Sequence, residues 1–328
     1  MKKSLLFSAT LLLFGFASAQ TSAPQKQTLP KDDETLVYPH PDAVLTLRAG
    51  DPHPTVDGWK FFTANEFQPT SRKDKRPKGF VENFNRNMSR TAKIDNRKCS
   101  EVVDGVLRMI SIHTPQPVDN GFGKKVNYLH ACYRSSPLGA HDGWCTFTEN
   151  MRVEIRYRRT DTQGFNNALW FMNNSHKPWP KGGEIDLLEN PKKQINQKVH
   201  FTLHSENYYA GVMGGNGSTT ASIELEDLKD WNIFWIEWYP DRIVGGVNGQ
   251  PYFEHTKGAN GNTDWPWSDP EGFYLIISTG ISDDPNRWPG AVAPEQWDPA
   301  NPPSMEVDWV RVYVNDDYKG PKSKNIYY

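Results

Sequence analysis

The segment GGEIDLLEN, Gly182–Asn190, places three acids among large apolar residues. The acids are Glu184, Asp186 and Glu189, and the apolar residues are Ile185, Leu187 and Leu188. Apolar residues at this density are typical of a segment that packs against a core. Burying an unpaired carboxylate is costly. The segment therefore has to place its acids on a face of its own, away from that core.

Strand alternation predicts where the three acids point. In a regular strand, successive side chains alternate between the two faces, so Glu184 and Asp186 share a face. Glu189 is five positions after Glu184 and would point the other way. A β-bulge at Leu187-Leu188 adds one residue and returns Glu189 to the face of the other two. We therefore predict three carboxylates on one surface, with the apolar residues behind them.

This arrangement suits glycoside hydrolysis. Glu184 and Glu189 would be about 13 Å apart along the backbone, at about 3.3 Å per strand residue. Two glutamate side chains that lean together can bring their carboxyl groups to roughly 5–5.5 Å, the separation used by retaining glycosidases. Asp186 between them can hydrogen-bond the nucleophile and separate the pKa values of the pair. A calcium or other cation site, and a plain solvated acidic face, are alternatives.

The rest of the chain has mainly strand signals. Residues 150–159 (NMRVEIRYRR) alternate strictly, and 105–114 (GVLRMISIHT) alternate with β-branched residues. Asn248-Gly249 lies between two short strands and predicts a hairpin turn, because both central residues need positive φ. Helical periodicity is nearly absent. The pattern predicts an all-β sandwich or barrel.

Residues 1–19 have the features of a secretory signal peptide. Lys2 and Lys3 precede a short apolar run, and Ala17-Ser18-Ala19 resembles a cleavage site. We expect a secreted or periplasmic protein without membrane insertion, a flexible segment at 20–45, one catalytic domain at 46–316 and a C-terminal tail at 317–328. The formal net charge is −2, and −4 without the two leader lysines, which disfavours nucleic acid as a partner. Cys99, Cys132 and Cys145 allow one disulfide, most simply Cys132–Cys145.

The motif and its flanks resemble glycoside hydrolase family 16. Glu184-Ile185-Asp186-Leu187-Leu188-Glu189 is similar to the bulged E-x-D-x-x-E signature of laminarinases, agarases, porphyranases and carrageenases, and differs from the shorter E-x-D-x-E of lichenases. The flanking matches are W-P-x-x-G-E at 179–184, V-H-x-T-L-H at 199–204, an aromatic strand with a P-D turn at 234–241, and M-x-V-D-x-V-R-V-Y at 305–313. The similarity covers roughly residues 75–315.

The resemblance implies a concanavalin-like jelly-roll β-sandwich with a concave substrate cleft and an endo-acting, retaining mechanism. Glu184 then matches the nucleophile, Asp186 the assisting acid and Glu189 the acid/base. No cofactor is implied for the reaction, although a structural Ca²⁺ on the convex face is common in such folds. We expect a monomer that acts on a polysaccharide or oligosaccharide.

Six further residues are candidates for substrate binding. Aromatic rings can stack on sugars, and by resemblance several of these positions lie near the cleft. They are Trp170, Trp179, His204, Asn166, Trp288 and Glu154. For Trp170 the alternative is core packing. For Glu154 it is a surface ion pair with a neighbouring arginine.

The substrate stays open at this point. Asn166 stands where laminarinases usually have a tryptophan, so a β-galactan such as agar, porphyran or a mucin glycan competes with β-1,3- or mixed-linkage glucan. Arg152, Arg156, Arg158 and Arg159 raise the idea of a sulfated substrate. A non-catalytic lectin on the same fold and a transglycosylase that uses the same site are alternative functions. The intact set of three acids favours hydrolysis over binding alone.

Overall fold

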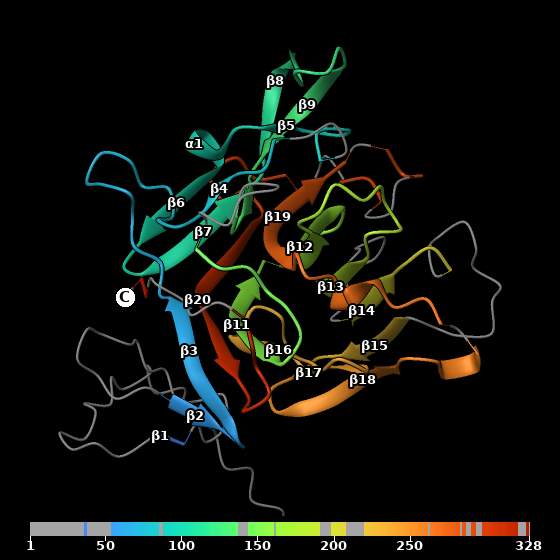
Figure 1. The fold of residues 1–328 in the computed structure, drawn as a ribbon. Helices are drawn as coiled ribbons and strands as arrows, with labels where there is room; N and C mark the ends of the chain where they lie inside the picture. Colours follow the sequence, from blue (N-terminus) through green and yellow to red (C-terminus); the bar gives the residue numbers. More distant parts are fainter. Residues whose placement is uncertain are drawn as a thin grey trace, which may run out of the picture.

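Two large β-sheets pack face to face in the computed structural model of the chain (Figure 1). The structure describes residues 36–37, 54–84, 88–136, 144–160, 162–190, 198–207, 220–261, 263–282, 284–286, 290–292, 297–320 and 326–327. The predicted signal peptide lies outside these residues, and of the predicted segment 20–45 only Leu36–Val37 is included. The predicted all-β sandwich is confirmed.

The ten-stranded sheet is largely antiparallel and contains both the early and the late strands of the chain. Its strands follow the order β1-β2-β3-β20-β11-β16-β17-β18, and β7 and β6 extend it beside β20. Their bounds are β1 Leu36–Val37, β2 Pro54–Val56, β3 Trp59–Asn65, β6 Ser100–Val103, β7 Val106–Ile110, β11 Met151–Arg159, β16 Asn232–Trp238, β17 Arg242–Val247, β18 Gln250–Thr256 and β20 Ser304–Val314.

The seven-stranded sheet carries the three-acid segment as one of its inner strands. Its order is β15-β14-β13-β12-β19-β10-β4. The bounds are β4 Val81–Glu82, β10 Cys132–Arg134, β12 Phe165–Asn173, β13 Glu184–Glu189, β14 Lys198–His204, β15 Thr220–Glu224 and β19 Phe273–Ile281. A small third sheet extends from the body in Figure 1 and contains β5 Lys93–Ile94, β8 Ile112–Asp119 and β9 Lys125–His130.

Helix is confined to three short pieces in the described residues. These are α1 Asn96–Cys99 and the 3₁₀ turns Ala259–Gly261 and Pro266–Ser268. None of the described helices is both long and apolar enough to cross a membrane. The predicted hairpin turn is present between β17 and β18, where Asn248 and Gly249 have φ values of 50° and 79°.

The main core fills the space between the two large sheets. On β11 the core-facing residues include Val153 and Ile155, and on β13 they include Ile185, Leu187 and Leu188, all fully buried. Burial of each leucine contributes roughly 1.5–3 kcal/mol relative to exposure. The sheets approach so closely at Gly245 that a Cβ there would lie 2.3 Å from the Phe201 ring. This core covers one face of the seven-stranded sheet. The opposite face, which we call the open face, is available for polar groups.

The Cys132–Cys145 disulfide that the sequence allows is not formed, and all three cysteines are buried free thiols. Cys145 belongs to the main core between the large sheets. Cys132 packs instead with Ile94, Tyr274 and Ile276 in a separate small cluster. Because strand residues alternate between faces, the sheet itself separates these two sulfur atoms.

Candidate active site

Strand β13 contains the bulge that the sequence predicts. On β14, Asp186 lies opposite Thr202 and Glu189 opposite His200, so two residues of β13 face the single residue between them. On β12, Leu188 lies opposite Leu169 and Asp186 opposite Trp170, which leaves Leu187 as the extra residue. Because of the bulge, the side chains of Glu184, Asp186 and Glu189 all point to the open face.

Glu184 is held from two sides by tryptophans. The indole Nε1 of Trp179 donates a hydrogen bond to its carboxylate. The indole Nε1 of Trp267 donates to its backbone carbonyl at 3.2 Å. Gly183, directly before it, has φ +82°, and a Cβ there would lie 2.9 Å from the Pro266 ring. Glycine is therefore needed at 183 both for its backbone angle and for the close approach of this loop.

Asp186 is almost fully buried, with 3% of its surface exposed. Its Oδ2 lies 3.0 Å from Nε2 of His204, which is on the neighbouring strand. The Asp186 carboxyl is also hydrogen-bonded to the side chain of Glu184. The Trp179 and His204 rings lie 6.1 Å apart. These contacts make a connected chain of polar groups from Trp179 through Glu184 and Asp186 to His204.

Two of the acids have strongly raised pKa values. Burial raises the pKa of Glu184 well above its usual range, and the negative charge of Asp186 raises it further. His204, the hydrogen bond from Trp179 and the charge of Glu189 have smaller effects, the first two lowering the value. Burial and the charge of Glu189 likewise raise the pKa of Asp186. Closely spaced carboxylates in a dry environment resist simultaneous ionisation.

The structure places Trp170 and Asn166 on the open face of β12. Trp170 lies opposite Asp186, packs against the small cluster of Tyr274 and Ile276, and donates from Nε1 to Ser278 Oγ at 3.2 Å. Asn166 lies near the end of β12, where its Oδ1 is buried and accepts no hydrogen bond from the described residues. Trp170 is thus partly a packing residue and partly available to a ligand.

Glu154 is not near the three acids, contrary to our expectation. It lies on β11 of the ten-stranded sheet, where the side chains of Val153 and Ile155 enter the core. Alternation therefore turns Glu154 to the outer face, and it accepts hydrogen bonds from Nε and Nη2 of Arg152 at 2.9 and 2.7 Å. The alternative of an ion pair with a neighbouring arginine is correct. Trp288 lies outside the described residues.

Three of the four arginines of β11, Arg152, Arg156 and Arg158, pair with acids on the outer face, whereas Arg159 bonds to Asn190 and to the backbone of Phe165. Arg152 also donates to Glu237 at 2.6 Å, and Arg156 donates to Asp308 at 2.5 Å. The guanidinium of Arg152 lies 4.4 Å from the Trp235 ring centroid, a cation–π contact. These partners leave Arg152 and Arg156 no part in a sulfate site on the open face.

Several residues of the site escaped sequence reasoning. Tyr274 lies opposite Met172 on the open face, and the charge of Glu184 contributes to its raised pKa, whose largest cause is burial. Tyr274, Trp179 and Gly183 line a pocket of about 230 Å³ beside Glu184. Trp267 and Ser278 are further examples. Their positions depend on pairing between segments about a hundred residues apart, although the tryptophan-rich DWPW at 264–267 was a usable signal.

The donor set near the acids does not suit calcium. Among the described residues, one group of three or more acidic, histidine or cysteine ligand atoms lies close together, from Glu184, Asp186 and His204, within 4.8 Å of one another. Calcium takes six to eight oxygen ligands, whereas this set includes a nitrogen and its acids are hydrogen-bonded to each other. These three residues are therefore not a calcium site, and they do not mark the calcium that the resemblance implies on the convex face.

Part of the chain is similar to glycanases of known activity. The chain is 31% identical over 167 residues to the keratan-sulfate endo-1,4-beta-galactosidase of Sphingobacterium multivorum, covering 49% of this chain and 36% of that protein. It is 30% identical over 178 residues to a beta-glucanase of Rhodothermus marinus, covering 49% of this chain and 56% of that protein. The chain thus matches only about a third to a half of these relatives' lengths.

The fold has close structural counterparts. The laminarinase catalytic domain of Thermotoga maritima superposes with a TM-score of 0.64 at 22% identity, covering 80% of this chain and all of that one. The jelly-roll sandwich expected from the sequence is therefore confirmed. The family model of glycosyl hydrolases family 16 matches residues 146–311, which include β11 to β19 and all three acids. The chain belongs to glycosyl hydrolases family 16.

Proposed function

We propose that this protein is an endo-acting, retaining β-glycanase with Glu184 as nucleophile, Asp186 as its assisting acid and Glu189 as acid/base. The observation that carries the proposal is the bulge, which turns three carboxylates to one face of β13. Endo-glycanases among the relatives support the same reaction class. A binding protein has no need of closely spaced, mutually repelling acids, whereas a double displacement needs two of them, the nucleophile and the acid/base.

In the first step, a Glu184 oxygen forms a bond to the anomeric carbon while the bond to the leaving oxygen breaks. Glu189 gives its proton to that oxygen. In the second step, water attacks the same carbon, Glu189 takes the water proton, and the bond to Glu184 breaks. The Asp186 and Glu184 carboxyl groups are hydrogen-bonded and can share one proton, and the attack requires that this proton lie on Asp186 so that Glu184 is ionised.

The residues around the acids fit a sugar-binding role. Half of the surface of Trp179 is exposed, and its ring stands beside Glu184, so one face is available for stacking on a sugar. His204 fixes Asp186 from the opposite side. We assign substrate contact to Trp179, Trp170, His204 and Asn166, and Trp288 stays a prediction.

We propose a β-galactan as the substrate, with β-glucan as the second candidate. Asn166 favours galactan, because its half-buried amide, whose Oδ1 has no partner among the described residues, offers polar hydrogen-bonding groups where laminarinases usually have a flat ring. The keratan-sulfate endo-galactosidase supports this choice, and the Rhodothermus beta-glucanase supports the second candidate.

A reducing-end assay tests the proposal. The panel contains keratan, agarose, porphyran, mucin glycans, laminarin and mixed-linkage glucan, each with wild type, Glu184→Gln and Glu254→Gln, a control on exposed β18. We expect activity on one β-galactan, a loss of at least roughly 1000-fold in Glu184→Gln, and no change in the control. NMR of the first product reports whether the anomeric configuration is retained.

Other outcomes identify the alternatives. Binding of a glycan without hydrolysis by wild type indicates a lectin. Products longer than the substrate indicate a transglycosylase. Equal activity in Glu184→Gln contradicts the assigned nucleophile. Export and the monomeric state, which we also propose, are checked by sequencing the N-terminus of the mature protein and by light scattering.

A further inference from the structure

A row of side chains crosses the open face from Glu184 to β19. Glu184 on β13 lies opposite Met172 on β12, and Met172 lies opposite Tyr274 on β19. Residues directly opposite each other on neighbouring strands share a face of the sheet. Met172 and Tyr274 also line the pocket of about 230 Å³ beside Glu184, which we call the Tyr274 pocket. This pocket therefore follows the row away from the acids.

Arg134 lies just beyond Tyr274, on the next strand, β10. Its neighbours in the chain show which way it points. Tyr133 enters the main core, whereas Cys132 packs with Tyr274 in the small cluster on the open face. Alternation turns Arg134 to the same face as Cys132. The Cζ of Arg134 lies 5.9 Å from the centroid of the Tyr274 ring, so the guanidinium borders the end of the Tyr274 pocket.

Strand register also places Arg134 in line with the acids. Asp186 lies opposite Trp170, which lies opposite Ile276. Ile276 in turn lies opposite Arg134. Arg134 is therefore three strand spacings from Asp186, or about 14 Å at about 4.8 Å for each spacing.

A glycan in this site has to cross the strands. The nucleophile and the acid/base of a retaining glycosidase flank the bond that is cleaved. Glu184 and Glu189 are both on β13, at its two ends, so the glycan passes between them across this strand. From β13 it continues on one side over β12 and β19 to β10. Arg134 is thus on the path of the substrate.

The positive charge of Arg134 has no carboxylate partner among the described residues. The side chain is half-buried, and its Nε is buried and donates no hydrogen bond within that part of the chain. Burial raises the pKa of Tyr274, and the guanidinium of Arg134 beside it lowers that pKa in part. A half-buried cation without a counter-charge costs free energy. An anionic ligand would supply the missing charge.

Two lysines near Glu184 differ from Arg134, because acids already neutralise them. Lys177, which lines the Tyr274 pocket, donates to Asp269 at 2.5 Å. Lys181 lies 2.9 Å from Glu206. Their ammonium groups are therefore engaged before any ligand binds.

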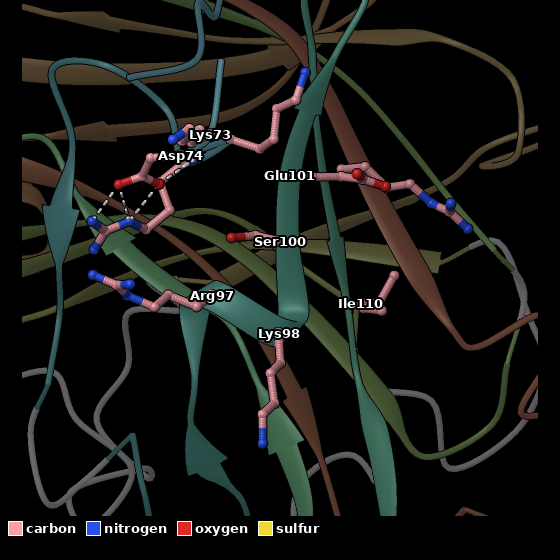
Figure 2. A pocket seen from close by; sticks show the side chains of 10 residues that line it. Lys73, Asp74, Arg97, Lys98, Ser100, Glu101 and Ile110 are labelled. Atoms are coloured by element: carbon pink, nitrogen blue, oxygen red, sulfur yellow. Dashed lines mark hydrogen bonds and ion pairs between the residues drawn. The ribbon is translucent and has the colours of Figure 1, made fainter. Parts of the chain in front are cut away.

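A group of six cations lies away from the open face (Figure 2). It lines a second pocket, of about 400 Å³, and consists of Lys73, Lys75, Arg76, Arg97, Lys98 and Arg108. Arg108 pairs with Glu306, which also pairs with Arg158 on the outer face of the ten-stranded sheet. A glycan that lies over the acids does not cross this second pocket, so its arginines can serve as controls.

We propose that Arg134 determines substrate specificity by binding an anionic substituent of the glycan, a sulfate ester or a carboxylate, at the end of the Tyr274 pocket. The inference rests on the proposed function, which places the cleavage point over β13. A planar guanidinium donates two parallel hydrogen bonds to such oxyanions. Arg134 then selects which glycans are accepted, while the three acids perform the reaction.

Binding in the Glu184→Gln background tests this inference without turnover. Arg134→Gln removes the charge, and Arg134→Lys keeps the charge without the planar fork. The control Arg97→Gln removes the same charge from an exposed position on α1, outside the open face. The probes form two matched pairs, keratan sulfate with its desulfated form and sialylated mucin glycans with their desialylated form. Calorimetry gives Kd, and circular dichroism and Tm report whether each variant folds.

We expect a charged chain to bind the background protein at least roughly tenfold more tightly than its uncharged form. Arg134→Gln should remove this preference, Arg134→Lys should keep part of it, and Arg97→Gln should leave it unchanged. The pair that shows the preference identifies the anion as sulfate or carboxylate.

Three results overturn the proposal. The first is the absence of a preference for the charged chain in both pairs. The second is the same preference in Arg134→Gln as in the background protein. The third is equal weakening of charged and uncharged chains by Arg134→Gln, because Arg134 is then only a packing partner of Tyr274. If Arg134→Gln does not fold, Arg134→Lys carries the test, and an unchanged preference in Arg134→Lys then contradicts the proposal.

The same materials separate this inference from the proposed function. Hydrolysis of the uncharged chains by wild type, without any preference that depends on Arg134, supports the reaction and removes the inference. A preference for charge that depends on Arg134, in a protein that hydrolyses none of the probes, leaves the anion site in place and removes the enzyme.

Discussion

Two groups of buried acids in this sandwich differ in the side chains that they contact. On the outer face of the ten-stranded sheet, Glu154 of β11 and Glu237 of β16 both accept hydrogen bonds from Arg152. Burial alone would lower the pKa of Arg152, and the two carboxylates raise it above its usual value. On the open face of β13, Glu184 and Asp186 are paired with each other, with an indole and with a histidine, and with no lysine or arginine among the described residues.

The difference separates structural from reactive acids. A buried carboxylate that meets a guanidinium keeps its charge, and removing either partner leaves the other charge buried without compensation. A buried carboxylate beside other carboxylates has a raised pKa and can exchange a proton near neutral pH. The acids of both groups follow strand alternation. The side chains that they contact, and not their positions in the strand, therefore distinguish the two groups.

The largest expected effect tests the reactive group. Glu189→Gln should lower kcat on a polysaccharide by roughly 100- to 10,000-fold, because the leaving oxygen loses its proton donor. With an aryl glycoside whose leaving group needs no proton, the first step in Glu189→Gln should be almost as fast as in wild type. Burst kinetics measure the rate of this step. Equal losses on both substrates would contradict the acid/base assignment.

The next effect tests the structural group. Glu154→Gln should reduce the free energy of unfolding by about 3 kcal/mol, since Arg152 stays buried with Glu237 as its remaining carboxylate. Urea unfolding measures the change, with exposed Glu254→Gln as a control within about 0.5 kcal/mol. The kcat of the folded fraction should not change. A parallel loss of kcat would place Glu154 in the reaction after all.

A third prediction concerns stability and pH. A carboxyl whose pKa is raised on folding stabilises the protein below its unfolded pKa, and this contribution is lost as pH rises through the folded pKa. The ionised Glu184 therefore costs stability at neutral pH, and Glu184→Gln should raise Tm there. Below about pH 4 both forms are neutral, and the two Tm values should converge. A lower Tm for the variant at pH 7 would show that Glu184 is structural.

The smallest effect concerns the indole beside Glu184. Trp179→Phe keeps an aromatic face but removes the hydrogen bond that lowers the Glu184 pKa. We expect kcat/KM to fall about tenfold, as for the loss of one hydrogen bond to a charged group. The acid limb of the pH–activity profile should move to higher pH, because the nucleophile has to be ionised. If the acid limb of the profile does not move and only KM rises, Trp179 contributes sugar stacking and does not act on the Glu184 pKa.

The bulge and the sandwich followed from the sequence because both depend on local patterns. Leu187 and Leu188 must both be buried, and the acids on either side of them can share a face only if the strand has one extra residue there. Glu154 was misplaced because alternation assigns a residue to a face of its strand, but not that strand to one of two sheets. Only the pairing of β11 with β16 and β20 supplies that information.

The other omissions share one physical cause. Tyr274 and Trp267 reach Glu184 through pairings across about a hundred residues. The disulfide failed because Cys132 and Cys145 lie on opposite sides of a sheet. Register between distant segments is a property of the folded core and not of any short motif.

The buried thiols have a practical consequence for spectroscopy. Burial raises the pKa of Cys99 and of Cys132 to about 12 and raises that of Cys145 as well. Alkylating dyes react with thiolates, so the native cysteines should be silent towards them at neutral pH. A single Val103→Cys, at a 44% exposed position on β6, would then accept a fluorophore selectively. The wild-type chain thus already serves as the unlabelled background for a site-specific label.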